Sequence, residues 1–316
     1  MVGGRLSQLG ALFLAWSAAA CGGSEDSSPT IPGDGGGVDS GEITAPCGPS
    51  SLAGGTFSLS FAGVEYGYLV HLPPSYDGMK RTPLVLNWHG LTSNAQQQEF
   101  FSNFDPVADD EGLIVVYPNS PDASWNAGTC CASNAPTRDD VGFARALVAE
   151  ISSKACIDPK RIYAMGMSNG GFMSFRLGCD AADLFAAIAP VAGKIGITGC
   201  QPARPIPLLA FHGTADTLVA YSTGGLSPDM LTVPDTARKW AELDACTKGP
   251  DVSLERGNVR CEAWSSCQGG TSVTLCTIDG GGHCWPGQSF CPYPPSTVDV
   301  DASREIATFF KSFKLP

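Results

Sequence analysis

The sequence predicts an α/β fold with a mostly parallel central sheet, helices on both faces and no large lid domain. Two observations carry this prediction. Short apolar runs typical of buried strands alternate with segments of helical periodicity, which is the pattern of a parallel sheet with crossover helices. The second observation is an expected antiparallel hairpin that precedes these alternating segments. No repeat or second linker interrupts residues 47–316, and this length suits one large domain.

The expected elements follow one another along the chain. Gly55–Phe61 and Glu65–Leu72 alternate in polarity and predict the hairpin. Further strands are expected at Pro83–Trp88, Leu113–Tyr117, Ile162–Met165, Phe185–Val191, Pro207–Phe211, Val259–Trp264 and Ser272–Ile278. Helices are expected at Gln96–Phe101, from Asp139 and Asp140 through Ile151, at Phe172–Leu177, at Val233–Leu243 and over the apolar face from Ile306 to Phe313.

The first 46 residues are expected to direct export. Arg5 and the apolar segment Leu9–Ala20 predict a signal peptide over residues 1–20, too short to span a bilayer as a mature helix. The small residues Ala18–Ala20 fit ordinary secretory cleavage, whereas Cys21 resembles the lipidated cysteine of a bacterial lipobox. Residues 21–46 are rich in Gly, Ser, Pro and Asp and predict a flexible tether. We therefore expect an extracellular or cell-envelope protein, with Cys21 as the candidate lipid anchor.

Cysteine usage agrees with export. Of thirteen cysteines, twelve remain if Cys21 carries lipid, and an even number scattered along the chain predicts disulfides in an oxidising compartment. Sequence proximity favours the pairs Cys179–Cys200 and Cys284–Cys291, while spacing leaves the other pairings open. No C-x-x-C pair or His/Cys spacing indicates zinc, so no metal site is expected.

The charge excludes one class of partner. The formal net charge is −12, with 19 Lys and Arg residues against 31 Asp and Glu. A nucleic-acid surface needs clustered cations that displace counterions, so we expect no nucleic-acid partner. A membrane would be contacted only through a lipid on Cys21.

The segment Gly166–Gly170 is a G-x-S-x-G motif between an expected strand and an expected helix. This context is the one that a nucleophile elbow requires, because the flanking glycines permit a sharp turn that exposes the serine hydroxyl. Ser168 is therefore the candidate nucleophile.

A serine nucleophile needs a histidine base oriented by an acid, and in α/β sheets with such an elbow the chain order is serine, acid, histidine. The sequence contains four histidines, His71, His89, His212 and His283. Only His283 comes late enough to follow an acid placed after Ser168, and it lies in a glycine-rich loop behind an expected strand. His283 is therefore the candidate base.

The candidate acid is Asp216, which directly follows the strand that ends at Phe211. Functional residues of open α/β sheets collect beyond the carboxyl ends of the strands. Asp244 is a weaker alternative, and Asp279 lies very near His283 along the chain.

For the oxyanion hole we expect one backbone N–H from Asn169, and a second from Leu91 or, as the alternative, Thr92. His89 is expected to shape this turn rather than to take part in the chemistry.

An ordered set of motifs resembles the polyhydroxybutyrate depolymerase/feruloyl esterase family of secreted α/β-hydrolases, from about Gly67 to Phe313. The resemblance implies an α/β-hydrolase fold, hydrolysis of carboxylic esters without a cofactor, and a triad of Ser168, Asp216 and His283. Leu91 departs from the family, in which many members have Cys after His-Gly, and so does the extra loop between Cys284 and Cys291. The motifs are Asn87–Gly90, Trp125–Gly128 with Cys130 and Cys131, Asp139–Phe143, Gly166–Gly171, Phe185–Pro190, Phe211–Asp216 and His283–Gly287.

The connection Ala192–Ile206 is too short for the helices that form an interfacial lid, so we expect an open site suited to esters carried on a polymer. Trp125 and Trp285 are candidate substrate-binding walls. Feruloylated polysaccharide, polyhydroxyalkanoate and acetylated xylan remain open as substrates. The alternatives to an esterase are a non-catalytic binding lipoprotein of the same fold and a peptidase.

Overall fold

The computed structural model describes residues 47–316 except 49, 132–136, 226–229 and 292. The described residues belong to one compact unit. The expected signal peptide, the tether and the candidate anchor Cys21 lie outside the described residues. In the described part, no helix combines the length and apolar character that crossing a membrane requires.

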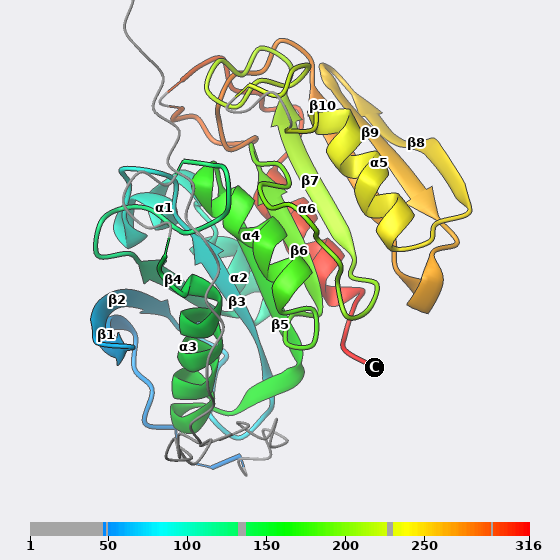
Figure 1. The fold of residues 1–316 in the computed structure, drawn as a ribbon. Helices are drawn as coiled ribbons and strands as arrows, with labels where there is room; N and C mark the ends of the chain where they lie inside the picture. The colour runs from blue at the N-terminus through cyan, green and yellow to red at the C-terminus, as the bar shows by residue number, and fades with distance from the viewer. Residues whose placement is uncertain (1–46, 49, 132–136, 226–229, 292) are drawn as a thin grey trace, which may run out of the picture. The chain divides into compact units, whose positions relative to one another are not determined.

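The described strands form one ten-stranded sheet in the order β1-β2-β4-β3-β5-β6-β7-β10-β9-β8 (Figure 1). Its middle, from β4 to β10, is parallel, and antiparallel strands extend it at both edges. The strands are β1 (Gly55–Phe61), β2 (Val64–His71), β3 (Thr82–Trp88), β4 (Ile114–Asn119), β5 (Ile157–Met167), β6 (Ala187–Val191), β7 (Leu208–Gly213), β8 (Lys248–Arg256), β9 (Val259–Ser265) and β10 (Val273–Ile278). The prediction of a mostly parallel α/β sheet is confirmed.

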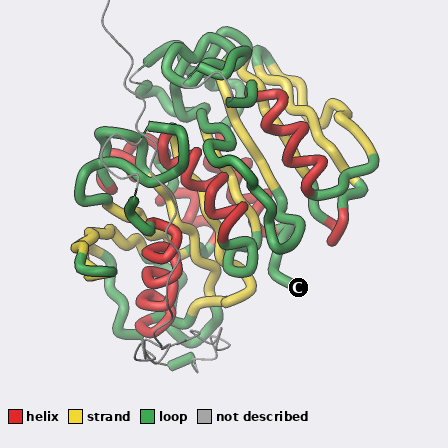
Figure 2. Tube along the Cα trace, in the orientation of Figure 1, coloured by secondary structure: helices red, strands yellow, loops and turns green. Residues whose placement is uncertain are grey.

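Helices cover both faces of the sheet, as the tube in Figure 2 also shows. The helices are α1 (Ala95–Ser102), α2 (Asp105–Glu111), α3 (Asp140–Lys154), α4 (Asn169–Asp180), α5 (Val233–Leu243) and α6 (Ala302–Lys311), with a 3₁₀ turn at Gln268–Gly270. One buried cluster joins one face of the sheet to α3, α4 and α5, and a second cluster joins the other face to α1, α2 and α6. Central strands such as β3 and β6 are buried on both faces, which explains their continuous apolar runs.

Two elements differ from the prediction. The short helix α2 was not expected, although Pro106 at its start and Gly112 at its end are typical boundary residues. The edge strand β8 was not expected either, because all of its residues except Leu254 are exposed and no apolar alternation marks it. It pairs with β9 and extends the antiparallel edge.

Six disulfides join the twelve cysteines of the described part. The predicted pairs Cys179–Cys200 and Cys284–Cys291 are confirmed. The other four pairs are Cys47–Cys156, Cys130–Cys131, Cys246–Cys267 and Cys261–Cys276. The Cys130–Cys131 disulfide joins adjacent residues, and Cys131 lines the pocket described below.

Candidate active site

Ser168 lies in the sharp turn between β5 and α4. Its backbone has φ 57° and ψ −123°. L-residues rarely adopt this conformation, and such backbone strain is concentrated at functional sites. The neighbouring glycines are required by close packing, because a Cβ atom at Gly166 would lie 2.5 Å from the Trp88 carbonyl oxygen and one at Gly170 only 2.0 Å. The motif therefore forms the strand–turn–helix elbow that the sequence predicts.

Asp216 and His283 meet beyond the ends of the adjacent parallel strands β7 and β10. His283 Nδ1 lies 2.7 Å from Asp216 Oδ2. The loops that carry the two residues are joined directly, because Ala215 N donates to Gly281 O at 2.9 Å. A Cβ atom at Gly213 would lie 2.2 Å from Gly281 O, so this approach of the loops requires glycine.

Asp216 is held as a buried carboxylate. Its Oδ1 accepts hydrogen bonds from Leu218 N at 2.9 Å and Val219 N at 2.8 Å. His212 Nε2 lies 3.3 Å from Oδ2 and also donates to Val219 O at 2.8 Å. Burial alone would raise the pKa of Asp216, but the hydrogen bonds from His212 and His283 hold it well below its usual range. Oδ2 is therefore a negatively charged acceptor for His283 Nδ1–H.

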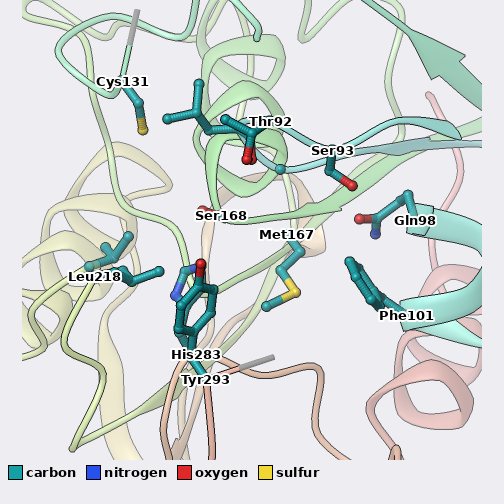
Figure 3. Close-up of a pocket in the computed structure, with 13 residues that line it drawn as sticks. Thr92, Ser93, Gln98, Phe101, Cys131, Met167, Ser168, Leu218, His283 and Tyr293 are labelled. Carbon is teal, nitrogen blue, oxygen red and sulfur yellow. The ribbon is translucent and has the colours of Figure 1, made fainter. Parts of the chain in front are cut away.

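Ser168 and His283 line the same pocket, which has a volume of about 360 Å³ (Figure 3). Asp216 is not part of its surface and lies behind His283. The walls come from the loop after β3, from α1 and from the loops after β7 and β10. Their side chains are mostly apolar and include Leu91, Phe101, Met167, Leu218, Val219 and Tyr293.

The backbone donors expected for an oxyanion hole lie beside Ser168. Asn169 is the first residue of α4, and Leu91 lines the pocket in the loop after β3. Within the described residues neither backbone N–H has a hydrogen-bond acceptor. The alternative donor Thr92 is already used, because its N–H donates to Ala123 O at 2.8 Å. The geometry therefore favours Leu91 over Thr92.

The two tryptophans do not form the pocket walls that the sequence suggested. Trp125 has no exposed surface, donates from Nε1 to His89 O at 3.0 Å and packs edge-on against Trp88. Trp285 is 1% exposed and donates from Nε1 to Ser303 Oγ at 2.9 Å. Both indoles find their hydrogen-bond partners inside the protein, so the prediction of a substrate-binding role is corrected.

Trp125 instead helps to position the elbow. Its backbone N–H donates to Asn169 Oδ1 at 2.6 Å, and Asn169 Nδ2 donates back to the Trp125 carbonyl at 3.1 Å. This paired contact fixes the side chain of the residue directly after Ser168. The Trp125 backbone thereby holds Asn169 in place directly behind Ser168.

His89 and the alternative acids lie outside the pocket surface. His89 is buried, its Nδ1 lies 2.7 Å from Gly90 O, and its Nε2 accepts from Ser120 N at 3.2 Å. Burial lowers the pKa of His89 to about 4, so this side chain is neutral and shapes the turn. Asp244 lies at the C-terminal end of α5 and accepts from Ile206 N, and Asp279 is exposed beside Thr214.

Sequence reasoning missed Lys194 and the second histidine that contacts the acid, His212. Lys194 is buried and donates from Nζ to the carbonyls of Ala220, Thr223 and Gly224, which ties down the loop that carries Asp216. A lone lysine between two strands carries no motif that would have identified it. His212 lies four residues before Asp216 in the chain, and its role depends on the loop conformation.

Neither a metal site nor a cofactor site was expected. Within the residues that the structure describes, no group of three or more His, Cys, Asp or Glu side chains could hold a metal ion.

Comparisons with known proteins agree with the geometry. Residues 66–199 match the family described as esterase PHB depolymerase. The chain is 41% identical over 231 residues to feruloyl esterase B of Piromyces equi, a match that covers 68% of this chain but only 42% of that relative. It is 30% identical to the putative esterase NocK of Nocardia uniformis subsp. tsuyamanensis, over 94% of both chains.

A solved structure supports the fold alone. The acetyl xylan esterase from Aspergillus awamori superposes with a TM-score of 0.58 at 16% sequence identity, covering 82% of this chain and 99% of that one. The α/β arrangement described above is therefore shared with a known esterase structure.

Proposed function

Because the chain belongs to the polyhydroxybutyrate depolymerase/feruloyl esterase family of carboxylic-ester hydrolases, we propose that it cleaves polymer-linked esters through an acyl-enzyme on Ser168. One observation supports this most directly: Ser168 and His283 line one pocket, and His283 Nδ1 lies 2.7 Å from the buried carboxylate of Asp216. A serine becomes nucleophilic when an oriented base takes its proton.

The proposed reaction has two halves. In the first, His283 Nε2 takes the proton of Ser168 as Oγ attacks the ester carbonyl carbon. The backbone N–H groups of Leu91 and Asn169 stabilise the oxyanion, the bond to the alcohol oxygen breaks, and His283 returns the proton to the leaving alcohol. In the second half, water gives a proton to His283 and attacks the acyl carbon, the bond between that carbon and Ser168 Oγ breaks, and His283 returns the proton to Oγ as the acid is released.

The open surroundings of the pocket support a substrate carried on a polymer. Residues 192–207 between β6 and β7 contain no helix that could form a lid there. Large apolar side chains are exposed around the entrance, among them Leu91, Leu218 and Tyr293. A pocket of about 360 Å³ is at the small end for a ligand site and suits a single acyl unit.

Feruloyl and hydroxyalkanoyl groups are the acyl units that we propose, with acetylated xylan as the alternative. One relative is a feruloyl esterase, and another is the bifunctional acetylxylan esterase/xylanase XynS20E of Neocallimastix patriciarum. The apolar walls favour an acyl group larger than acetyl, because burial of apolar surface supplies binding energy in proportion to area.

We also propose that the protein is exported through residues 1–20, with residues 21–46 as a tether and with Cys21 as a lipid anchor. The six disulfides of the described part support an oxidising compartment. Mass spectrometry of the mature protein from its host would test the anchor. An unmodified N-terminus that starts at or beyond Cys21 would argue for free secretion.

A hydrolysis panel tests the proposed activity. It contains methyl ferulate, p-nitrophenyl butyrate, acetylxylan and polyhydroxybutyrate, assayed with the wild type and with Ser168→Ala. We expect turnover of the first two that falls by about 10⁶-fold in the variant. A fluorophosphonate probe should label the wild type on Ser168. An unlabelled, inactive wild type would instead support a binding protein that retains the fold, and cleavage of peptides in place of esters would support a peptidase.

A further inference from the structure

The side chain of Gln98 places an unpaired polar atom in the wall of the pocket. Gln98 lies on α1, has no exposed surface and donates from Nε2 to Asn87 Oδ1 at 2.8 Å. Its Oε1 is buried without a hydrogen-bond partner. The other unpaired buried side-chain atoms of the described part belong to residues that do not line this pocket. An unpaired buried acceptor costs free energy, so Gln98 Oε1 is a position where a ligand donor would be stabilising.

A chain of hydrogen bonds sets the orientation of this amide. Asn87 accepts from Gln98 Nε2 and donates from Nδ2 to Ser102 Oγ at 3.0 Å, and Ser102 Oγ in turn donates to Glu99 O at 3.3 Å. The nitrogen of the Gln98 amide is therefore bound to Asn87, which fixes which end of the amide is the oxygen. The oxygen of Gln98 is thereby left on the pocket side, where Figure 3 shows the amide between Ser93 and Phe101.

The nearby hydroxyls already have partners. Ser93 Oγ donates to Gln97 Oε1 at 2.9 Å, and Thr92 Oγ1 donates to Leu91 O at 2.6 Å. Among the described side chains that line this pocket, Gln98 is therefore the one with a buried acceptor that has no partner.

An aromatic ring and a thioether flank the amide. Phe101 follows Gln98 by three residues on α1, so both side chains lie on one face of the helix and both line the pocket. The Phe101 ring stacks on Phe290 at a centroid distance of 5.6 Å, which holds it in place. Met167 lies next to Ser168 and also lines the pocket. A flat apolar group with a hydroxyl at its far end would contact all three side chains.

We propose that Gln98 determines acyl specificity by accepting a hydrogen bond from a phenolic hydroxyl on the acyl group, while Phe101 and Met167 contact its ring. This inference rests on the proposed esterase function. Because Gln98 has no exposed surface, a neighbouring side chain of the pocket must move before the hydroxyl reaches Oε1, and the unbranched thioether of Met167 in the same pocket is the side chain that adapts most readily.

The test compares esters that differ in one hydroxyl. We expect the wild type to hydrolyse methyl 4-hydroxycinnamate with a kcat/KM about tenfold or more above that for methyl cinnamate and for methyl 4-methoxycinnamate. In Gln98→Met, which lacks both donor and acceptor, this ratio should fall to about one. Gln96→Met is the matched control, since Gln96 is exposed on the same helix and does not line the pocket, and it should keep the wild-type ratio.

The ratio separates recognition from structural damage, because a poorly folded variant loses activity on all three esters together. A wild type that hydrolyses the esters without preference for the hydroxyl would overturn the role of Gln98 and leave the esterase proposal standing. If no ester is hydrolysed, calorimetric binding of 4-hydroxycinnamate and cinnamate to the protein decides instead. Equal affinities, or a preference that survives Gln98→Met, would overturn the inference.

Discussion

Asp216 holds His283 through one carboxylate oxygen while its other oxygen is held by the backbone. Oδ2 lies 2.7 Å from His283 Nδ1, and Oδ1 accepts from the N–H groups of Leu218 and Val219. Two backbone donors therefore set the rotation of the carboxylate. The atom in the Oδ2 position decides which nitrogen of His283 carries the proton.

Replacing Asp216 by Asn should reverse the tautomer of His283. The donors on Leu218 and Val219 would select the amide oxygen, so the amide NH₂ would face Nδ1 and act as a donor. His283 would then carry its proton on Nε2 and could not accept one from Ser168. We expect kcat for p-nitrophenyl butyrate to fall by about 10³–10⁴-fold. The control is Asp279→Asn, an exposed aspartate close to His283 in the sequence, and a large loss there would contradict the assignment.

Gly170→Ala should disrupt the elbow. A Cβ atom at this position would lie 2.0 Å from the Trp88 carbonyl oxygen, so β3 and α4 would have to separate. We expect a loss of about 3 kcal/mol or more in the free energy of unfolding, measured by urea denaturation. Gly54→Ala is the control, because its Cβ atom would have Val70 O as its nearest neighbour at an ordinary 3.6 Å. A loss of less than about 1 kcal/mol for Gly170→Ala would show that the packing adapts.

The main elements of the fold could be predicted because their signals are local. Strands β3 and β6 are buried on both faces, and burial on both faces produces continuous apolar runs that stand out in a sequence. Strand β8 has the opposite environment, since it is exposed at the sheet edge and is defined by its pairing with β9. A pattern-based prediction lacks information about such pairing.

Some residues of the candidate site could likewise be predicted from the sequence, and others could not. Ser168 and Asp216 follow directly from strand ends, and His283 followed from the chain order of the four histidines. The role of Trp125 could not be predicted, because exposure of an indole depends on which distant groups, here Trp88 and Asn169, pack against it. Gln98 was equally hidden, since α1 shows no motif and only the fold brings it to the pocket.

Arg138 should be a large contributor to stability. It is 12% exposed and pairs with Asp140, which is fully buried, and with Asp122 at 2.6 Å. Removing the cation would leave a buried carboxylate without its counter-ion. We therefore expect Arg138→Met to lower the free energy of unfolding by about 3–5 kcal/mol. Arg145→Met is the matched control, because its pair with Asp183 is exposed and such pairs contribute about 0–1 kcal/mol.

The same Arg138 variant should also slow catalysis. Arg138 hydrogen-bonds Ser120 and the Ser124 carbonyl, and so holds the loop whose Trp125 contacts Asn169. If the loop moves, Asn169 loses its contact with Trp125, and the position of its backbone N–H, the proposed oxyanion donor, is no longer fixed. We expect kcat to fall with little change in KM, at a temperature where the variant is still folded. Unchanged kcat would show that the elbow keeps its position without this loop.

Asp244 should make stability depend on pH in an unusual direction. Burial raises its pKa to about 6, although Thr271 Oγ1 and Ile206 N donate to it and oppose the shift. A carboxyl with a raised pKa in the folded state binds its proton more tightly there than in the unfolded chain. Its contribution to stability is therefore greatest at low pH and is lost as pH rises from about 4 through 6.

Asp244→Asn removes this titration, because the amide stays neutral and can still accept from Ile206 N. Relative to the wild type, the variant should gain about 2 kcal/mol in the free energy of unfolding between pH 4.5 and pH 7.5. Urea denaturation at the two pH values measures this difference. Parallel pH profiles for the two proteins would show that Asp244 ionises in the folded state as it does in the unfolded chain.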